Sequence, residues 1–319
     1  CVLVSYGHQG RRLLEEHNAF TVNSLKDVEE ILFDNRVVDF HTHSTCSDGT
    51  LTPKALVNHA KKSGLSAFAL TDHDSVDGIK EAKEEAERIG VEFIAGIEFS
   101  AAENTETHII GLFIDPENEI LLDTIKKLKD SRRRRMEDIC RKLRDLGFDI
   151  THEEALRVAG GNFVGRAHIA KLMVTKGYCE TVKECFDKYI GLGKPAYSEK
   201  NELTATEAVK SIRASGGLAF LAHLNQTGYD LEQLENLLTE LKEAGLNGIE
   251  GYYPEYTAEH TSRYRALAEK LSLAISGGSD YHADMKPHIQ IGVGKGDLRI
   301  PYYVLENLKN ILKKENETV

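Results

Sequence analysis

The stretch VVDFHTHSTCSD, residues 37–48, joins a short apolar run at 37–41 to two histidines and an aspartate. Similar runs recur along the chain at 67–71 (AFALT), 92–98 (EFIAGIE), 107–114 (THIIGLFI), 217–223 (GLAFLAH), 247–252 (NGIEGY) and 272–279 (SLAISGGS). Short apolar runs of this kind are typical of buried parallel strands. Segments with helical spacing and caps lie between most of them, such as Thr52-Pro53 before KALVNHAKKSG. The sequence therefore predicts an α/β fold with a parallel sheet covered by helices.

Two segments depart from this alternation. Residues 116–191 show helical patterns without strands, and we interpret them as a helical insertion that caps the substrate. Residues 1–36 contain one helical signal, Ser24 to Asp27 before VEEILF, and are predicted to form an N-terminal extension. The main unit then consists of residues 37–115 and 192–319.

Composition narrows the function classes. The chain has 319 residues, 41% of them hydrophobic, and a net charge of −11, which argues against stable binding of duplex nucleic acid or anionic membranes. No apolar stretch approaches the ~20 residues of a spanning helix, and no signal-peptide pattern opens the chain. The five cysteines are odd in number and show no metal-site spacing. We expect a cytoplasmic protein with reduced thiols.

Polar residues with metal-binding side chains follow most of the predicted strands. Because the carboxyl ends of parallel strands meet at one edge, these side chains are expected to converge. They are His41, His43, Asp48, Asp72, His73, Glu98, His108, His223, Asp280 and His282.

Burying so many imidazoles and carboxylates together is costly without cations. A mixed imidazole and carboxylate set suits zinc, iron or manganese, and its size suggests about two or three ions that share bridging carboxylates. Such sites characteristically hydrolyse phosphate esters. Hydrolysis is therefore the leading class of reaction.

Several motifs resemble those of the PHP family, named for polymerase and histidinol phosphatase. They are FHTHSTCSDGT (40–50), ALTDHD (69–74), GIEFS (96–100), THIIG (107–111), AH (222–223), GIEGYYP (248–254) and GGSDYHAD (277–284). The resemblance implies a distorted (β/α)7 barrel with a trinuclear centre, often manganese but also iron or zinc. The helical segment between the fourth and fifth motifs is similar to that of the nucleoside-3′,5′-bisphosphate phosphatases and related 5′-to-3′ exonucleases.

The resemblance also implies a distribution of ligands. One ion takes His41, His43, Glu98 and Asp280; the second takes Asp48, His73 and His282; the third shares Glu98 with His108 and His223. Asp72 is expected to orient the ligating side chains. Glu98, Asp280 and His282 are the residues expected to matter most for catalysis.

The sequence departs from the family pattern at a position where the family often has a residue that acts on the leaving group or the phosphate of the substrate. Where the family often has a histidine after GIEGYYP, this chain has Tyr256, and His260 follows four residues later. Both are candidates for contact with the substrate. The identity of the general acid stays open, because a phenol is a weak acid near neutral pH.

Arginines of the insertion are candidates for holding a second phosphate, since the guanidinium presents a planar fork of donors. Arg166 is one candidate. Arg132 and Arg135 share a helix face within the run 132–135, whereas Arg133 and Arg134 point elsewhere. The alternative for this run is a solvated helix face that pairs with neighbouring acids.

The predicted function is metal-dependent hydrolysis of the 3′-phosphate of nucleoside 3′,5′-bisphosphates, of short 5′-phosphorylated oligonucleotides, or of both. Within the enzyme class, the alternatives are a histidinol phosphatase, a 5′-nucleotide phosphatase and a cyclic ribose-phosphate phosphodiesterase. The non-enzymatic alternative is a PHP module that metals merely stabilise.

Overall fold

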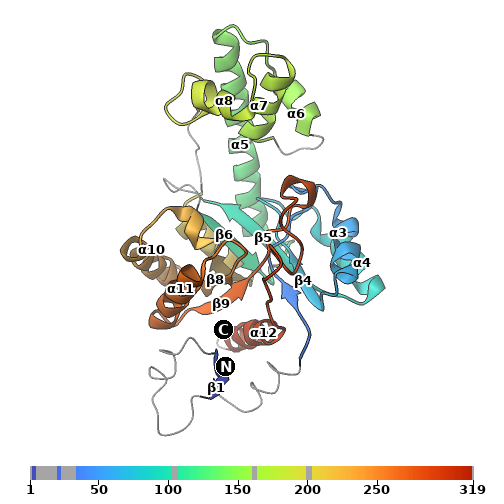
Figure 1. Ribbon diagram of the computed structural model, residues 1–319, viewed down its shortest axis with the longest axis vertical. Coiled ribbons are helices and arrows are strands. Elements are labelled where there is room, and N and C mark those ends of the chain that lie inside the picture. The colour runs from blue at the N-terminus through green and yellow to red at the C-terminus, as the bar shows by residue number, and fades with distance from the viewer. Residues whose placement is uncertain are drawn as a thin grey trace.

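The computed structural model describes residues 2–4, 20–22, 34–101, 107–159, 164–198 and 203–317. A seven-stranded sheet runs in sequence order from β3 to β9 and curls into a barrel-like layer (Figure 1). Its strands are β3 (Val38–Asp39), β4 (Ala67–Leu70), β5 (Glu92–Ser100), β6 (His108–Leu112), β7 (Leu218–Leu221), β8 (Gly248–Tyr252) and β9 (Ala274–Gly277). Each lies within or overlaps a predicted run, and the α/β class with a distorted (β/α)7 barrel is confirmed.

The prediction of an all-parallel sheet was wrong at β6. This strand pairs antiparallel with both β5 and β7, whereas the other strand pairs are parallel. Only residues 101–107 separate β5 from β6, which is too short for the crossover that a parallel pair requires. As a result, the first residue of β6 lies at the edge where the parallel strands end.

The first and last strands of the sheet approach each other. The Phe40 amide donates to the carbonyl of Gly277 at 3.1 Å, and the His43 amide donates to that of Tyr281 at 2.9 Å. Gly278 is required at this contact, because a Cβ there would lie 2.1 Å from the His41 Cβ. The segment after β9 is thereby held against the segment after β3.

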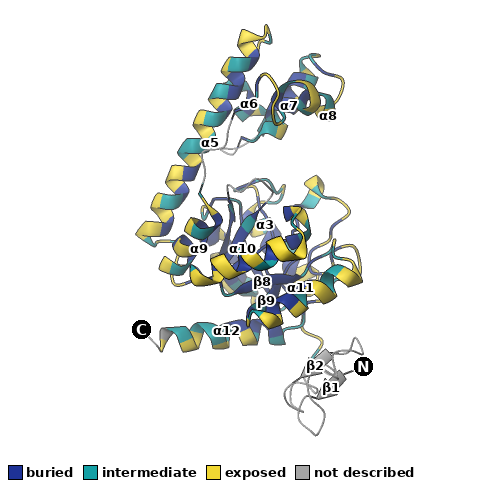
Figure 2. Cartoon of the chain, turned by 90° about the vertical axis from the view of Figure 1, so that its left-hand side faces the viewer, coloured by how far each residue is buried: buried dark blue, intermediate teal, exposed yellow. Residues whose placement is uncertain are grey.

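Helices cover the outer face of the sheet (Figure 2). They are α3 (Pro53–Lys62), α4 (Ile79–Ile89), α9 (Ala205–Ala214), α10 (Leu231–Glu243), α11 (Ala258–Lys270) and α12 (Tyr303–Asn316). Local sequence sets several of their ends: the Thr52 hydroxyl accepts from the Ala55 amide ahead of Pro53, and Gly90 ends α4 in the left-handed conformation. Two short 3₁₀ turns, η2 (Leu224–Thr227) and η3 (Ala283–Met285), follow β7 and β9.

The insertion consists of α5 (Glu119–Asp145), α6 (His152–Ala159), α7 (Arg166–Thr175), α8 (Val182–Cys185) and a π-helical turn at Phe186–Ile190. Helix α5 runs from the barrel into the insertion, which stands beyond one end of the barrel (Figures 1 and 2). Leu121 and Ile125 of its first half pack in the barrel core, whereas Ile139 and Leu143 pack in the core of the insertion. The division at residue 116 stays a prediction, since one continuous helix belongs to both parts.

Strands β1 (Val2–Val4) and β2 (Phe20–Val22) form a separate parallel pair. The helix expected after Ser24 lies outside the described residues. Among the helices described, none combines the length and the apolar composition needed to cross a bilayer.

Candidate metal centre

Glu98, near the end of β5, lies at the centre of a cluster of histidines. Its Oε2 atom lies 3.2 Å from the Nε2 atoms of His41 and His43 and 3.0 Å from Nδ1 of His73. Its Oε1 atom lies 2.8 Å from Nδ1 of His108 and 3.1 Å from Nε2 of His223. Glu98 is fully buried, so a single carboxylate connects imidazoles from four different strand ends.

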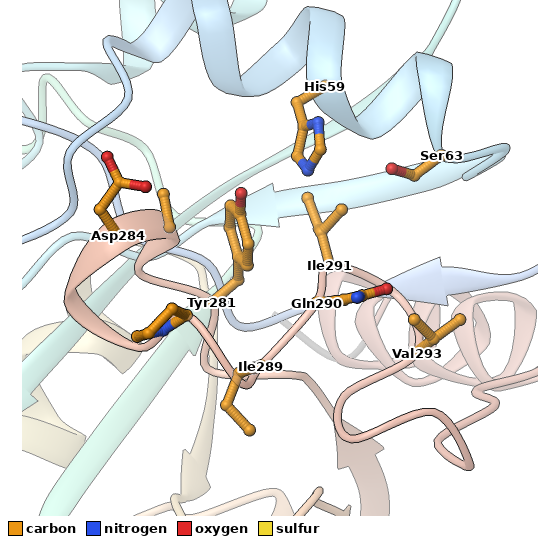
Figure 3. A pocket seen from close by; sticks show the side chains of 10 residues that line it. His59, Ser63, Tyr281, Asp284, Ile289, Gln290, Ile291 and Val293 are labelled. Carbon is orange, nitrogen blue, oxygen red and sulfur yellow. The ribbon is translucent and has the colours of Figure 1, made fainter.

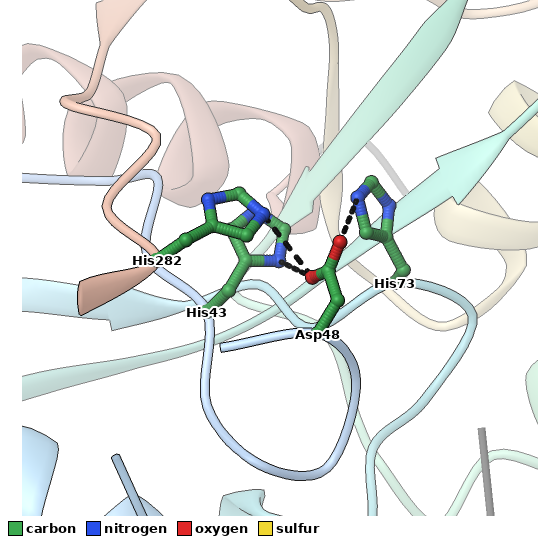
Figure 4. Close-up of side chains that lie close together, drawn as sticks. All are labelled: His43, Asp48, His73 and His282. Carbon is green, nitrogen blue, oxygen red and sulfur yellow. Dashed lines mark ion pairs between the residues drawn. The ribbon is translucent and has the colours of Figure 1, made fainter. Parts of the chain in front are cut away.

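Asp48 and His282 extend the cluster on one side (Figure 4). The Asp48 carboxylate lies 3.1 Å from Nε2 of His282 and 3.8 Å from nitrogens of both His43 and His73. Asp48 comes from the loop after β3 and His282 from the segment after β9. The approach of these two segments therefore builds this part of the site.

Asp280 completes the cluster next to His41 and His43. Its Oδ1 atom lies 3.6 and 3.4 Å from their respective Nε2 atoms and 3.3 Å from Nδ1 of His282. Asp280 and His223 have positive φ angles of 56° and 23°, which non-glycine residues rarely adopt. Such backbone strain persists where the surrounding structure holds it, and it is common at functional sites.

The donor set fits divalent metal ions. Several buried atoms in the cluster lack a hydrogen bond of good geometry: Nε2 of His41, Nε2 of His43, Nδ1 of His73, Nδ1 of His223 and Oε2 of Glu98. Unpartnered buried polar atoms are costly unless something binds them. Three overlapping groups could each hold an ion: His43, Asp48, His73 and His282; His41, His43 and Asp280; His73, Glu98 and His108. All the predicted ligand positions thus lie in one site.

The electrostatics of the site keep its carboxylates ionised. Burial alone would raise the pKa of Glu98, but the imidazoles of His73, His41 and His108 hold it well below the usual value. Burial similarly opposes ionisation of Asp280, whose pKa is nevertheless lowered by His41, His43 and Lys286. Carboxylates that stay ionised at neutral pH are suited to binding cations.

Glu250 supports the cluster and was missed by the sequence analysis. One carboxylate oxygen accepts from Nδ1 of His41 at 3.1 Å, and the other accepts from the His223 amide at 2.7 Å. The first bond leaves Nε2 of His41 available to a metal ion. A charged residue inside the apolar strand GIEGY was the signal that could have identified it.

Asp72 lies behind the cluster and accepts hydrogen bonds from the hydroxyls of Ser44 at 2.7 Å and Ser47 at 2.6 Å. The Ser47 oxygen in turn lies 3.5 Å from Nδ1 of His43. Asp72 therefore reaches a histidine of the cluster through a serine, and its orienting role stays a prediction.

Tyr256 has a hydroxyl that is bonded within the fold. It accepts from the Leu224 amide at 2.8 Å and donates to the Glu250 carbonyl at 3.0 Å. His260 stacks on Tyr264 with ring centroids 5.5 Å apart. Tyr253 reaches the cluster instead, donating to Oδ2 of Asp280 at 3.0 Å. Tyr253 was not singled out by the sequence analysis, and contact of Tyr256 or His260 with the substrate stays a prediction.

The three candidate arginines differ in their surroundings. Arg132 forms an ion pair with buried Asp74, directly after His73, and Arg135 donates to the Ser198 carbonyl at 3.0 Å. The guanidinium carbon of Arg166 lies 5.5 Å from the ring centroid of Phe186. Arg132 therefore links α5 to the barrel rim, and Arg166 forms no ion pair with a carboxylate of the described residues.

Helix α7 also brings His168 towards the cluster. Nδ1 of His168 accepts a hydrogen bond from the Gly165 amide at 3.1 Å, which places the proton of the neutral ring on Nε2. Burial lowers the pKa of His168, and the charge of Asp48 partly offsets that effect. The charge of Asp48 thus acts on His168, which lies in the same first turn of α7 as Arg166.

A separate pocket of about 570 Å³ lies between α3 and the segment after β9 (Figure 3). It is lined by residues of α3 and of positions 281–293, including His59, Tyr281 and Gln290. None of the predicted metal ligands lines it. The pocket is thus distinct from the candidate metal centre.

Comparisons with known proteins find similar sequences and a similar fold. The PHP domain family matches residues 39–316. The 5′-3′ exoribonuclease Rnm of Escherichia coli is 33% identical over 80% of this chain and 88% of its own length. The 3′,5′-nucleoside bisphosphate phosphatase of Chromobacterium violaceum is 32% identical over 77% of this chain and 87% of its own. A solved structure of a candidate metal-dependent phosphoesterase from Bifidobacterium adolescentis superposes with a TM-score of 0.74, at 28% identity, over 86% of this chain and 96% of its own.

Proposed function

This chain belongs to the PHP domain family and is a metal-dependent phosphoesterase, and from that premise we propose that it removes the 3′-phosphate of nucleoside 3′,5′-bisphosphates or trims short 5′-phosphorylated oligonucleotides. The observation that supports the proposal is the cluster around Glu98. Several of its buried histidine nitrogens and carboxylate oxygens, the atom types that bind metal ions, lack a hydrogen bond. The names of the relatives supply the substrate class.

We propose two or three manganese ions, with iron or zinc as alternatives, held by the residues of the three groups together with His223. Divalent ions bound there would neutralise the phosphoryl group and lower the pKa of water. The protein contributes the geometry: Glu250 fixes the ring of His41, Asp72 acts on His43 through Ser47, and Tyr253 orients Asp280. Burial of these groups excludes bulk water from the ligands.

The insertion is proposed to bind the second phosphate. Arg166 and His168 lie on the first turn of α7, and both side chains offer N–H donors that suit a 5′-phosphate. Arg132 and Arg135 are proposed to position the insertion, since each is already bonded to the barrel or to the chain that returns to it.

The test is release of inorganic phosphate by the manganese-loaded protein, with adenosine 3′,5′-bisphosphate and 5′-AMP assayed side by side. We expect a strong preference for the bisphosphate, and loss of roughly tenfold or more in kcat/KM for Arg166→Ala, because a hydrogen bond to a charged group is removed. Arg133→Ala is the matched control, since this arginine is 62% exposed and pairs with Asp130 of its own helix.

Equal rates with the two substrates would overturn the substrate assignment and leave the metal chemistry in place. Histidinol phosphate, 5′-nucleotides and cyclic ribose phosphates would then be assayed. Asp280→Asn separates a catalytic from a structural centre: loss of turnover with an intact circular dichroism spectrum supports catalysis.

A further inference from the structure

Lys286 directly follows η3 and lies at the edge of the cluster around Glu98. Its ammonium contacts Oδ2 of Asp280 at 2.5 Å. The backbone around it is fixed, because the Lys286 amide donates to the Ala283 carbonyl at 3.1 Å and its carbonyl accepts from the Ile289 amide at 2.9 Å. The short turn directly after His282 therefore sets the position of the lysine.

The lysine stands between Asp280 and solvent. Its side chain is 36% exposed, whereas that of Asp280 is 6% exposed. An ammonium group has three donors, and the contact with Asp280 uses one of them. A phosphate that enters the site from solvent would meet this group.

A purely structural role in holding the Asp280 carboxylate does not by itself explain why a positively charged side chain lies here. Tyr253 already donates to the same Oδ2 atom at 3.0 Å, and Gln226 in turn donates to the tyrosine hydroxyl at 2.8 Å. A fixed positive charge also repels the divalent ions that the neighbouring ligands would bind. The charge does have a favourable partner in a phosphate dianion, to which charge-assisted hydrogen bonds are strong.

We infer that Lys286 binds the phosphoryl group at the metal centre, donating to one of its oxygens while a second donor keeps Oδ2 of Asp280 in place. This inference rests on the proposed function, because it takes Asp280 as a metal ligand and a phosphate ester as substrate. It adds a residue for recognition of the reacting phosphate, in contrast to the arginines proposed to hold the second phosphate.

The experiment compares the full-length chain with Lys286→Gln and Lys286→Arg, each loaded with manganese. Three quantities are measured: metal content by elemental analysis, affinity for inorganic phosphate by calorimetry, and kcat and KM with adenosine 3′,5′-bisphosphate. Glutamine keeps a donor for Asp280 but removes the charge, and arginine keeps the charge. Lys295→Gln is the control, since it removes the charge of a lysine that is 46% exposed and pairs with Glu255 instead of with the cluster.

We expect Lys286→Gln to keep its metal content but to bind inorganic phosphate about tenfold or more weakly, with a similar loss in kcat/KM. Lys286→Arg should recover most of the phosphate affinity, and Lys295→Gln should leave it within about twofold of wild type. Wild-type phosphate affinity in Lys286→Gln would overturn the inference, as would a loss confined to metal content.

Failure of the proposed function gives a different pattern. A wild-type protein that releases no phosphate from any ester, yet binds phosphate in a manner that depends on Lys286, would refute the enzymatic proposal alone. If Lys286→Gln fails to fold, the phosphate affinity of Lys286→Arg relative to wild type still decides the question. An arginine variant that binds phosphate no better than about tenfold below wild type would contradict the role of the charge.

Discussion

Glu250 lies in the middle of β8 with no exposed surface, and both of its carboxylate oxygens hold parts of the metal-type cluster in place. It touches the ring of His41 and the backbone of His223, which come from opposite parts of the sheet. A residue of this kind acts on a metal ion through the ligands that it orients. Substitution of such supporting residues typically lowers metal affinity or activity.

We predict that Glu250→Gln lowers manganese affinity or activity by about 10–100-fold. The amide presents one NH₂ group where a carboxylate oxygen now accepts, so either the His41 ring or the His223 amide faces a second donor. Competition with a metal chelator measures the affinity, and Glu232→Gln on the exposed face of α10 is the control. Unchanged affinity in a folded variant would show that His41 needs no carboxylate partner.

At the scale of elements, buried ion pairs and hydrogen bonds connect helices that pack on the sheet. Glu85 of α4 is 4% exposed and accepts hydrogen bonds from Arg88 at 2.7 and 2.8 Å and from Asn58 of α3 at 2.6 Å. Arg88 and then Asn58 are the main causes that lower the pKa of Glu85 from 4.5 to about 2. These contacts between the two helices therefore favour the ionised form of Glu85.

The sign of the pH dependence follows from this lowered pKa. Its stabilisation is fully present above the ordinary pKa of 4.5 and is lost as the pH falls towards about 2. We predict that Glu85→Gln lowers the melting temperature near neutral pH and that the difference from wild type shrinks below about pH 4.5. Melting curves of chelator-treated protein measure this, with Glu84→Gln on the exposed face of α4 as control. A difference that stays constant down to about pH 3 would contradict the prediction.

At the scale of the whole molecule, the candidate centre joins residues from the first strand of the barrel to the segment after the last. An unfolded chain cannot hold these groups together, so metal binding stabilises the native state selectively. We predict that manganese at about a hundredfold above its Kd adds about 3 kcal/mol to the free energy of unfolding.

Thermal melting with and without a chelator measures this effect. We expect the melting temperature to fall by several degrees on metal removal and to recover on addition of manganese. Asp280→Asn should show a smaller shift. Identical melting curves with and without chelator would argue against a bound metal in the native protein.

The order of apolar runs and polar strand ends was enough to predict the α/β class, the positions of the strands and the group of ligand-type residues. These features are local in sequence, since strand length, helix caps and the residue after each strand follow from short-range chemistry. The antiparallel direction of β6 could also have been predicted from the sequence, because residues 101–107 leave no room for a crossover.

Only the tertiary structure decided the roles of Glu250, Tyr253 and Lys286 and the engagement of Arg132 with Asp74. Each role depends on which side chain of another segment lies opposite, and no periodicity along the chain encodes such a partner. The sequence by itself determined which residues could bind metals and phosphate, because side-chain chemistry is fixed by residue type. Folding decided which of them meet, because barrel closure brings together segments that are far apart in the chain.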